Sequence, residues 1–160
     1  MKEVSEKIYV LEADKAWARA RIDQLEREIL ELGPEFHIAL NQSTETWHDN
    51  APFDALRDKQ ALLVAEQQSL KAILFKAHVS VPNPKANLIG IGSKVTVQSG
   101  AKIHTYAIVG HWSPRVGEVE DGAMVVSCVS PLAAALLGAK VGQTVTLAHN
   151  KKELTIQAIA

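Results

Sequence analysis

Two acidic side chains, Glu45 and Asp49, lie four residues apart. Carboxylate oxygens are the hard ligands that Mg²⁺ prefers, and one or two of them often bind the ion together with water and phosphate. The spacing places both acids on one face if the segment is helical and leaves their separation open if it is a loop. The alternative is that both are ordinary solvated surface acids, because two carboxylates by themselves would form a poor metal site.

The residues between these acids include Trp47 and His48. A large aromatic side chain in a turn could pack against a partner or stack on a nucleic-acid base, or it could pack across Phe53 and cover the end of a neighbouring helix. His48 could transfer a proton or bind a phosphate, or it could simply be an exposed histidine. The sequence leaves these alternatives open.

Apolar residues recur with heptad spacing on both sides of this segment, which predicts two long helices that position it. On the first helix the two apolar heptad positions hold Ile8, Ile22, Ile29 and Phe36, and Leu11, Ala18, Leu25, Leu32 and Ala39. On the second helix they hold Phe53, Gln60, Gln67 and Leu74, and Leu56, Leu63, Leu70 and Ala77. If the chain reverses near Glu45, Phe36 lies opposite Phe53. We therefore predict an antiparallel coiled coil whose arms reach roughly 50 Å, at about 1.5 Å per residue, with the acids at its tip.

The composition changes sharply after His78. Residues 79–87 contain Pro82 and Pro84, which cannot continue a helix, so this segment is predicted to be an extended linker. The pattern beyond it is typical of strands. We predict a coiled-coil domain at residues 1–78, a linker at 79–87 and a β domain at 88–160.

Alternating apolar and polar residues predict about five strands in the β domain. These strands cover residues 94–98, 103–109, 123–129, 144–147 and 154–159. Ser130 followed by Pro131 is typical of a helix start, and Gly138 is typical of a helix end, so residues 131–137 are predicted to form a short helix. The fold class is α+β, with an N-terminal antiparallel helical hairpin followed by a small antiparallel β domain that carries one short helix.

Composition and charge exclude several classes of protein. The chain has 160 residues, of which 47% are hydrophobic and 22% charged, as in soluble globular proteins. No run approaches the roughly 18 apolar residues of a membrane helix, and acids in the first seven residues argue against a signal peptide, so we expect a cytoplasmic protein. We also expect it to be a monomer. Residues 1–79 carry 10 basic and 14 acidic side chains, whereas residues 80–160 carry 7 and 4. This distribution favours a protein-protein dock with a cation-attracting tip over a surface that coats DNA.

A Ser-Pro run in the β domain carries a family resemblance. It reads SPLAAALLG at residues 130–138 and is followed by KVGQTV at residues 140–145. The second helix opens with DNAPF at residues 49–53, an acid, Asn and Ala with an aromatic two positions later. In these motifs the chain resembles the Gre factors, bacterial transcript-cleavage and elongation factors, over nearly its whole length. The resemblance implies a coiled coil joined to an FKBP-like domain, with Pro34 forming a kink within the first helix.

The resemblance also implies chemistry at the tip. Gre factors insert the coil into the secondary channel of bacterial RNA polymerase, where tip acids help hold a catalytic Mg²⁺ and position a water that cleaves backtracked RNA. It assigns Asp49 as a catalytic and metal-binding residue, and we expect Glu45, the only other acid nearby, to share this role. The Mg²⁺ would be supplied in the polymerase active centre, and the nascent RNA 3′ end would be a second partner. The chain departs from the family at one point. Cleavage-competent members carry two acids three positions apart, and the residue three before Asp49 is Thr46.

Contacts with these partners follow from the same resemblance. It assigns partner binding to Ser130, Pro131 and Asn50, and RNA contacts to Arg57 and Lys59. Trp47 is a further candidate for partner binding, because a large aromatic side chain at a hairpin tip has little core to pack into. Ser130 and Pro131 lie in the motif that docks on the rim of the polymerase channel, although a helix cap alone also accounts for them. The two basic residues could equally be part of a solvated helix face. The resemblance to a class of transcription proteins also raises DNA binding as an expectation, which the charge distribution does not favour.

Four functions are compatible with this sequence. The leading hypothesis is a factor that stimulates cleavage of backtracked RNA by the polymerase's own active centre, and its alternative is a non-cleaving Gre-like regulator that occupies the channel and inhibits transcription. A peptidyl-prolyl isomerase would need an aromatic-lined pocket, and residues 80–160 offer only Tyr106 and Trp112. A structural coiled-coil adaptor would leave the Ser-Pro run and the DNAPF match unexplained.

Overall fold

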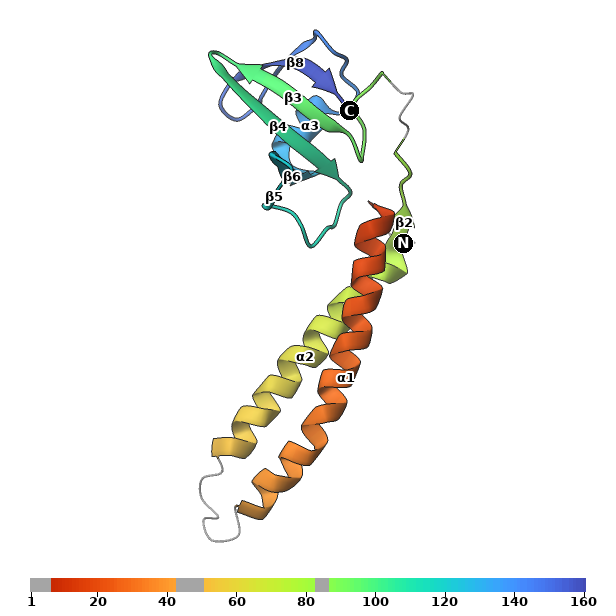
Figure 1. Cartoon of the computed structure of the whole chain (residues 1–160), viewed down its shortest axis with the longest axis vertical. Coiled ribbons are helices and arrows are strands. Elements are labelled where there is room, and N and C mark those ends of the chain that lie inside the picture. Colours follow the sequence, from red (N-terminus) through yellow and green to blue (C-terminus); the bar gives the residue numbers. More distant parts are fainter. Residues whose placement is uncertain (1–6, 43–50, 83–86) are drawn as a thin grey trace, which may run out of the picture. The chain divides into compact units, whose positions relative to one another are not determined.

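A computed structural model of the chain describes residues 7–42, 51–82 and 87–160. The chain divides into two compact units, one of which is Ala16–Phe75 and the other of which joins Met1–Lys15 to Lys76–Ala160. The first unit is a pair of helices, and the second is built on a β-sheet (Figure 1). The predicted boundaries at residues 78 and 88 are not tested by this division and stay a prediction.

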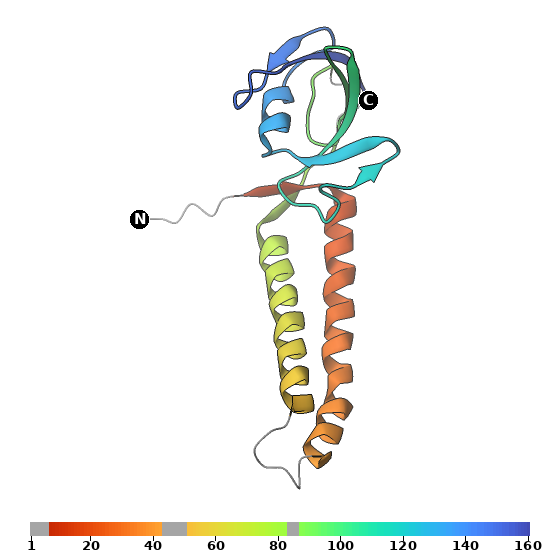
Figure 2. The same ribbon diagram turned by 90° about the vertical axis from the view of Figure 1, so that its left-hand side faces the viewer.

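The helical unit contains most of α1 (Glu12–Gln42) and of α2 (Ala51–Lys76). The two helices run antiparallel and side by side in both views of the molecule (Figures 1 and 2). The predicted register is confirmed, because the rings of Phe36 and Phe53 meet edge to face with centroids 5.5 Å apart. Four residues at one heptad position of α1 are at most 3% exposed, namely Ala18, Leu25, Leu32 and Ala39. Pro34 lies inside α1, as expected of a kink rather than an end.

The start of the predicted coiled coil is wrong. Ile8 belongs to a strand, β1 (Ile8–Val10), which pairs in parallel with β2 (Ala77–Val79) directly after α2. The heptad pattern includes Ile8 because its spacing from Leu11 fits a helix, although its spacing from Val10 equally fits the alternation of a strand. Helix α1 begins only at Glu12 and has two acids in its first turn, where their negative charge interacts favourably with the helix dipole.

Burial in the helix pair predicts unequal effects of two chemically identical substitutions. Leu25 is fully buried between the helices, whereas Leu30 is 72% exposed. We expect Leu25→Ala to lower the free energy of unfolding by about 2–5 kcal/mol, because it removes buried methyl groups and leaves a cavity. Leu30→Ala is the matched control and should change it by less than about 0.5 kcal/mol. Thermal unfolding followed by far-ultraviolet circular dichroism measures both, and equal effects would contradict this placement of the helix interface.

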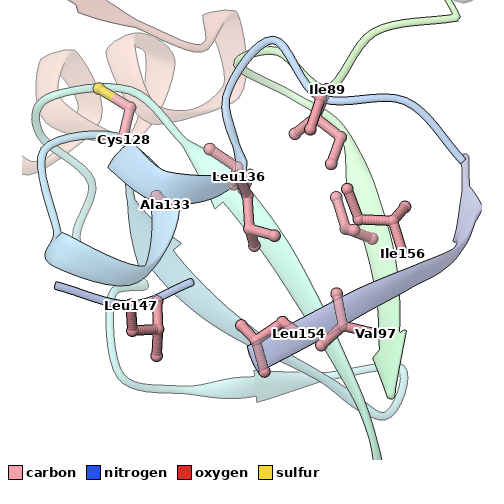
Figure 3. Packing of buried hydrophobic residues seen from close by; sticks show 11 residues of the cluster. Ile89, Val97, Cys128, Ala133, Leu136, Leu147, Leu154 and Ile156 are labelled. Atoms are coloured by element: carbon pink, nitrogen blue, oxygen red, sulfur yellow. The ribbon is translucent and has the colours of Figure 1, made fainter. Parts of the chain in front are cut away.

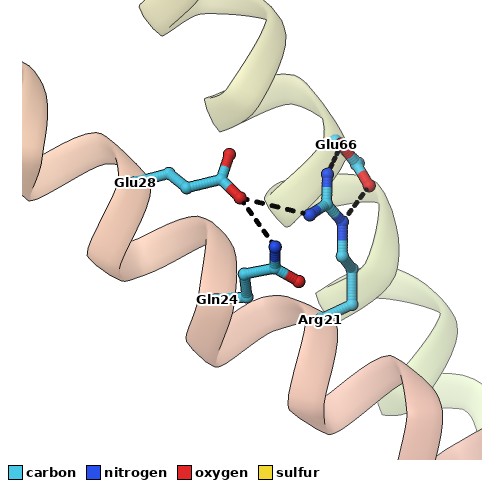
Figure 4. Close-up of polar contacts among 4 residues, drawn as sticks. All are labelled: Arg21, Gln24, Glu28 and Glu66. Atoms are coloured by element: carbon cyan, nitrogen blue, oxygen red, sulfur yellow. Dashed lines mark hydrogen bonds and ion pairs between the residues drawn. The ribbon is translucent and has the colours of Figure 1, made fainter.

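A polar cluster crosses between the helices on one side (Figure 4). Arg21 on α1 donates from Nε and Nη2 to the two carboxylate oxygens of Glu66 on α2, at 2.7 and 2.9 Å. Gln24 and Arg21 both donate to Glu28 one to two turns along α1. The fork geometry fixes Arg21 against α2 and so supports the same register as the Phe36–Phe53 contact.

This ion pair predicts a small pH dependence of stability. The hydrogen bonds from Arg21 hold the pKa of Glu66 below its usual value. The ion pair therefore contributes fully to the free energy of unfolding above the unfolded-state pKa of Glu66, about 4.3. This contribution is lost as the pH falls through the lower folded-state pKa. Because both side chains are partly exposed, Glu66→Gln should cost only about 0.2–1 kcal/mol at pH 7, and this cost should vanish in strong acid. Parallel denaturation curves of the two proteins at both pH values test it, and a constant difference would count against the ion pair.

The β domain contains a sheet of six strands in the order β5-β6-β4-β3-β8-β7. Its elements are β3 (Lys94–Ser99), β4 (Lys102–Val109), β5 (Val119–Glu120), β6 (Ala123–Ser127), α3 (Pro131–Leu136), β7 (Thr144–Thr146) and β8 (Glu153–Ile159). The predicted fold class, a helical hairpin and a β domain with one short helix, is confirmed. The structure adds the edge strand β5 and shows that β4 and β6 are parallel, whereas the other neighbours in this sheet are antiparallel.

The core of the β domain lies between one face of the sheet and α3 (Figure 3). Leu136 and Ala133 of α3 are fully buried against Val97 of β3 and Ile156 of β8. Cys128 belongs to this cluster, and burial raises the pKa of its thiol, which disfavours the reactive thiolate. Within the ranges described, no helix is long and apolar enough to cross a membrane.

Candidate functional site

Ser130 and Pro131 form the start of α3, as the sequence predicts. The Ser130 hydroxyl accepts a hydrogen bond from the Ala133 amide at 3.2 Å and donates one to the Ser127 carbonyl at 2.7 Å. Pro131 occupies the first helical position, where its missing amide proton costs nothing. The cap therefore joins the end of β6 to α3 and fixes the position of the exposed Pro131 ring.

An open groove of about 600 Å³ lies beside this cap. It is lined by small and apolar side chains with one imidazole: Pro131, Ala134, Ala135, Thr146, Ala148 and His149. Two exposed lysines, Lys151 and Lys152, follow the lining residue His149 after one intervening residue. Their backbones are hydrogen-bonded to Leu147, which lies between two lining residues in the sequence. This combination suits an apolar partner segment that also carries acidic groups. We call it the α3 groove.

A second hollow, of about 380 Å³, lies between α1 and α2 at the end that leads to the tip. Its lining residues are Glu35, Ile38, Ala39, Pro52, Ala55, Leu56 and Lys59. Small residues occupy several of these positions, and Glu35 and Lys59 bring one charge of each sign to the lining. The hollow is thus apolar with an electrically balanced lining, which does not by itself favour a phosphate.

The structure places only part of the predicted site. Glu45, Trp47, Asp49 and Asn50, together with His48, lie outside the described residues. Among the described residues, no cluster of three or more His, Cys, Asp or Glu side chains could hold a metal ion. The assignment of a metal or a catalytic role to the two acids therefore stays a prediction.

The two predicted RNA contacts are on α2, near its start. Arg57 is exposed and pairs with Asp54 one turn earlier, at 3.4 Å, so it would have to leave a carboxylate to reach a phosphate. Lys59 lies at the second hollow instead. Both roles stay predictions.

Sequence reasoning missed a packed junction around the start of α1. The buried carboxylate of Asp14 accepts hydrogen bonds from Arg115 Nε at 2.9 Å and Nη2 at 3.3 Å, while Arg115 Nη1 donates to Glu120 at 2.8 Å. These partners raise the pKa of the Arg115 guanidinium, the hydrogen bond to Asp14 contributing most. Asp14 and Arg115 are 101 residues apart, and no local pattern in the sequence connects them.

The strand β1 is held at the same junction. The Tyr9 amide donates to His111 Nδ1 at 3.0 Å, and the His111 amide donates to the Tyr9 carbonyl at 2.7 Å. The strand passes so close to Gly110 that a Cβ atom there would lie 2.0 Å from the Tyr9 carbonyl oxygen. A glycine in this position was a possible signal for close backbone approach, but many glycines in the chain have no such neighbour.

Comparisons with known proteins show which sequences this chain is similar to. Residues 83–160 match the family described as "Transcription elongation factor, GreA/GreB, C-term". The transcription inhibitor protein Gfh1 of Thermus thermophilus is 31% identical over 152 residues, covering 91% of this chain and 94% of that protein. The chain belongs to the GreA/GreB family.

Other members of the GreA/GreB family show related similarity. The transcription elongation factor GreA of Paracoccus denitrificans is 31% identical over 79% of this chain and 83% of its own length. The crystal structure of Gfh1 from Thermus thermophilus aligns over 97% of this chain and 99% of that chain, with 23% identity and a TM-score of 0.43. The similarity in sequence to the Gfh1 and GreA proteins, at 31% identity each, confirms the resemblance to Gre factors, whereas the expectation of DNA binding finds no support in these relatives.

Proposed function

We propose that this chain is a Gre-family regulator that binds RNA polymerase at its secondary channel and inhibits transcription without stimulating cleavage of backtracked RNA. The observation that carries the proposal is the similarity to a protein named as a transcription inhibitor, which extends over 91% of this chain and 94% of that relative. This coverage includes both the helix pair and the β domain.

The sequence of the tip supports the non-cleaving alternative. Thr46 occupies the position where cleavage-competent relatives are expected to carry the first of two acids. Glu45 adds a carboxylate one residue earlier, so negative charge is present but its spacing from Asp49 differs. A Mg²⁺ ion held by two carboxylates needs their oxygens at defined positions, whereas repulsion or occupation of a channel needs only charge and bulk.

The α3 groove is the polymerase-binding surface in this proposal. Pro131 belongs both to the groove and to the Ser-Pro run that carries the family resemblance. The groove supplies apolar area, and Lys151 and Lys152 supply charge for an acidic partner segment. The coil would then extend into the channel, and the proposed role of Glu45 and Asp49 is to act beside the polymerase's own Mg²⁺ and the nascent RNA 3′ end.

The decisive experiment uses stalled elongation complexes that have backtracked. Purified protein is added over a range of Mg²⁺ concentrations, the RNA is sized, and nucleotide addition is timed in parallel. We expect unchanged RNA length together with slower RNA extension. Shortened RNA would support the cleavage-factor alternative in place of this proposal. If the protein neither binds the complex nor changes the rate of extension, polymerase binding itself is refuted.

Stimulation of cleavage is the second candidate, and the similarity to elongation factors named GreA favours it. If shortened RNA is seen, Asp49→Asn should reduce cleavage at least about tenfold, because each 1.36 kcal/mol of transition-state stabilisation is worth that factor. Glu45→Gln should act similarly only if Glu45 substitutes for the displaced acid. Polymerase affinity is the control and should not change, since Asn and Gln keep the size of the side chains.

A further inference from the structure

We infer that Arg115 is a positioning residue: by holding the first turn of α1 on the β domain, it enables the coil to inhibit transcription. The first half of this inference, the anchoring of α1 on the β domain, concerns the free protein. The second, functional half, the effect on inhibition, rests on the proposed function. The observations that carry it are the burial of Asp14, the fork geometry of the Asp14–Arg115 pair and the second carboxylate, Glu120, on the same guanidinium.

The burial of Asp14 indicates that its carboxylate depends on its partner. Its side chain is 1% exposed, although acidic residues in a first helical turn normally remain in water. A buried carboxylate is costly unless it is paired, and removal of its partner leaves an uncompensated charge. Arg115 supplies two parallel hydrogen bonds, which define direction as well as distance.

Arg115 is itself fixed at several points. Its backbone amide donates to the buried Ser113 hydroxyl at 3.1 Å, and its Nη1 donates to Glu120 on β5. The loop that carries it includes His111, which forms two hydrogen bonds with Tyr9, three residues before α1. The first turn of α1 is therefore held by a loop that is anchored on the sheet.

Helix α1 continues without a break from this turn to Gln42. A regulator that binds a partner through its β domain and acts through the far end of a coil needs a firm connection at the start of that coil. Loss of the connection should reduce the effect at the tip more than the affinity of the β domain, because the α3 groove is formed by other residues.

The first test measures hydrogen exchange in the free protein. Arg115→Met should speed exchange of the amides in the first turns of α1 by at least about tenfold, with strands β3 and β8 unchanged, since only a local opening is made easier. Arg115→Lys keeps the charge but not the fork and should be intermediate. Arg19→Met, at an exposed position on the same helix, is the matched control. If exchange of the α1 amides is unchanged in Arg115→Met, Arg115 does not anchor α1. Unchanged exchange in β3 and β8 serves as the control that the β domain is folded.

The second test measures binding and inhibition separately on elongation complexes. Arg115→Met should bind RNA polymerase within about twofold of wild type but inhibit at saturation several-fold less, and adding Asp14→Asn should cause little further loss if the two residues act as one pair. Full inhibition by Arg115→Met would overturn the functional half. If wild-type protein itself neither binds nor inhibits, the proposed function and the functional half both fail, whereas the exchange experiment still decides the anchor.

Discussion

Gly110→Ala is expected to displace β1 and to destabilise the β-sheet unit strongly. The added Cβ would lie 2.0 Å from the carbonyl oxygen of Tyr9 and 2.8 Å from the Cα of Val10. Both are backbone atoms, which cannot turn away as the end of a side chain can, so the strand has to move. Its hydrogen bonds to His111 and its pairing with β2 would be strained or lost with it.

Overpacking of this kind costs about 1–3 kcal/mol or more, and each kcal/mol lowers the Tm of a domain of this size by roughly 4–8 °C. Calorimetry of the purified variant measures the shift. Gly90→Ala is the control, because a Cβ atom at Gly90 would have no neighbour within 4 Å and no positive φ is required there. Equal melting temperatures for wild type and Gly110→Ala would show that β1 does not lie on Gly110 in solution.

Ala134→Glu should abolish most of the binding to RNA polymerase. Ala134 is exposed on α3 and lines the α3 groove, so a longer side chain fills space that an apolar partner segment would use, and a negative charge opposes acidic groups on that partner. The loss should be at least about tenfold in Kd, equivalent to 1.4 kcal/mol. Stability should change little because Ala134 is not part of the buried cluster.

Two variants separate the causes of this loss. Ala134→Ser keeps the small size and should bind nearly normally, while Ala101→Glu adds the same charge in the turn between β3 and β4, away from the groove lining. Binding is measured by fluorescence anisotropy of labelled protein with polymerase core enzyme. If Ala134→Glu binds as tightly as wild type, the groove is not the docking surface.

Helix pairing could be predicted from sequence because its determinants are local and periodic. The Phe36–Phe53 contact follows from counting heptads in both directions from a single reversal. The same method failed at Ile8, where three residues of a strand share the spacing of a helix and the deciding contacts come from residues 77–79 and from Tyr9 pairing with His111. Periodicity contains no information about a partner so far along the chain.

The β domain shows a similar limit. Residue alternation located β3, β4, β6, β7 and β8, but it does not reveal direction, and the parallel arrangement of β4 and β6 was not foreseen. The edge strand β5 was missed although Asp121-Gly122 is a strong hairpin signal, and both residues indeed have positive φ. Of the predicted site, Ser130 and Pro131 could be placed from local capping rules, whereas the Asp14–Arg115 pair depends on tertiary packing alone.

The parallel pairing of β1 with β2 also bears on how the length of the coil can change during evolution. Residues 8–10 lie in register with residues 77–79, so the chain leaves the β-sheet unit and returns to it at adjacent points. Everything between them is, in effect, an insertion into a discontinuous domain. Removal of one heptad from each helix would preserve the register of facing layers and shorten the reach by about 10 Å, at 1.5 Å per residue. The reach of the coil can therefore change in steps of one heptad, while the surface of the β domain that docks on the partner stays the same.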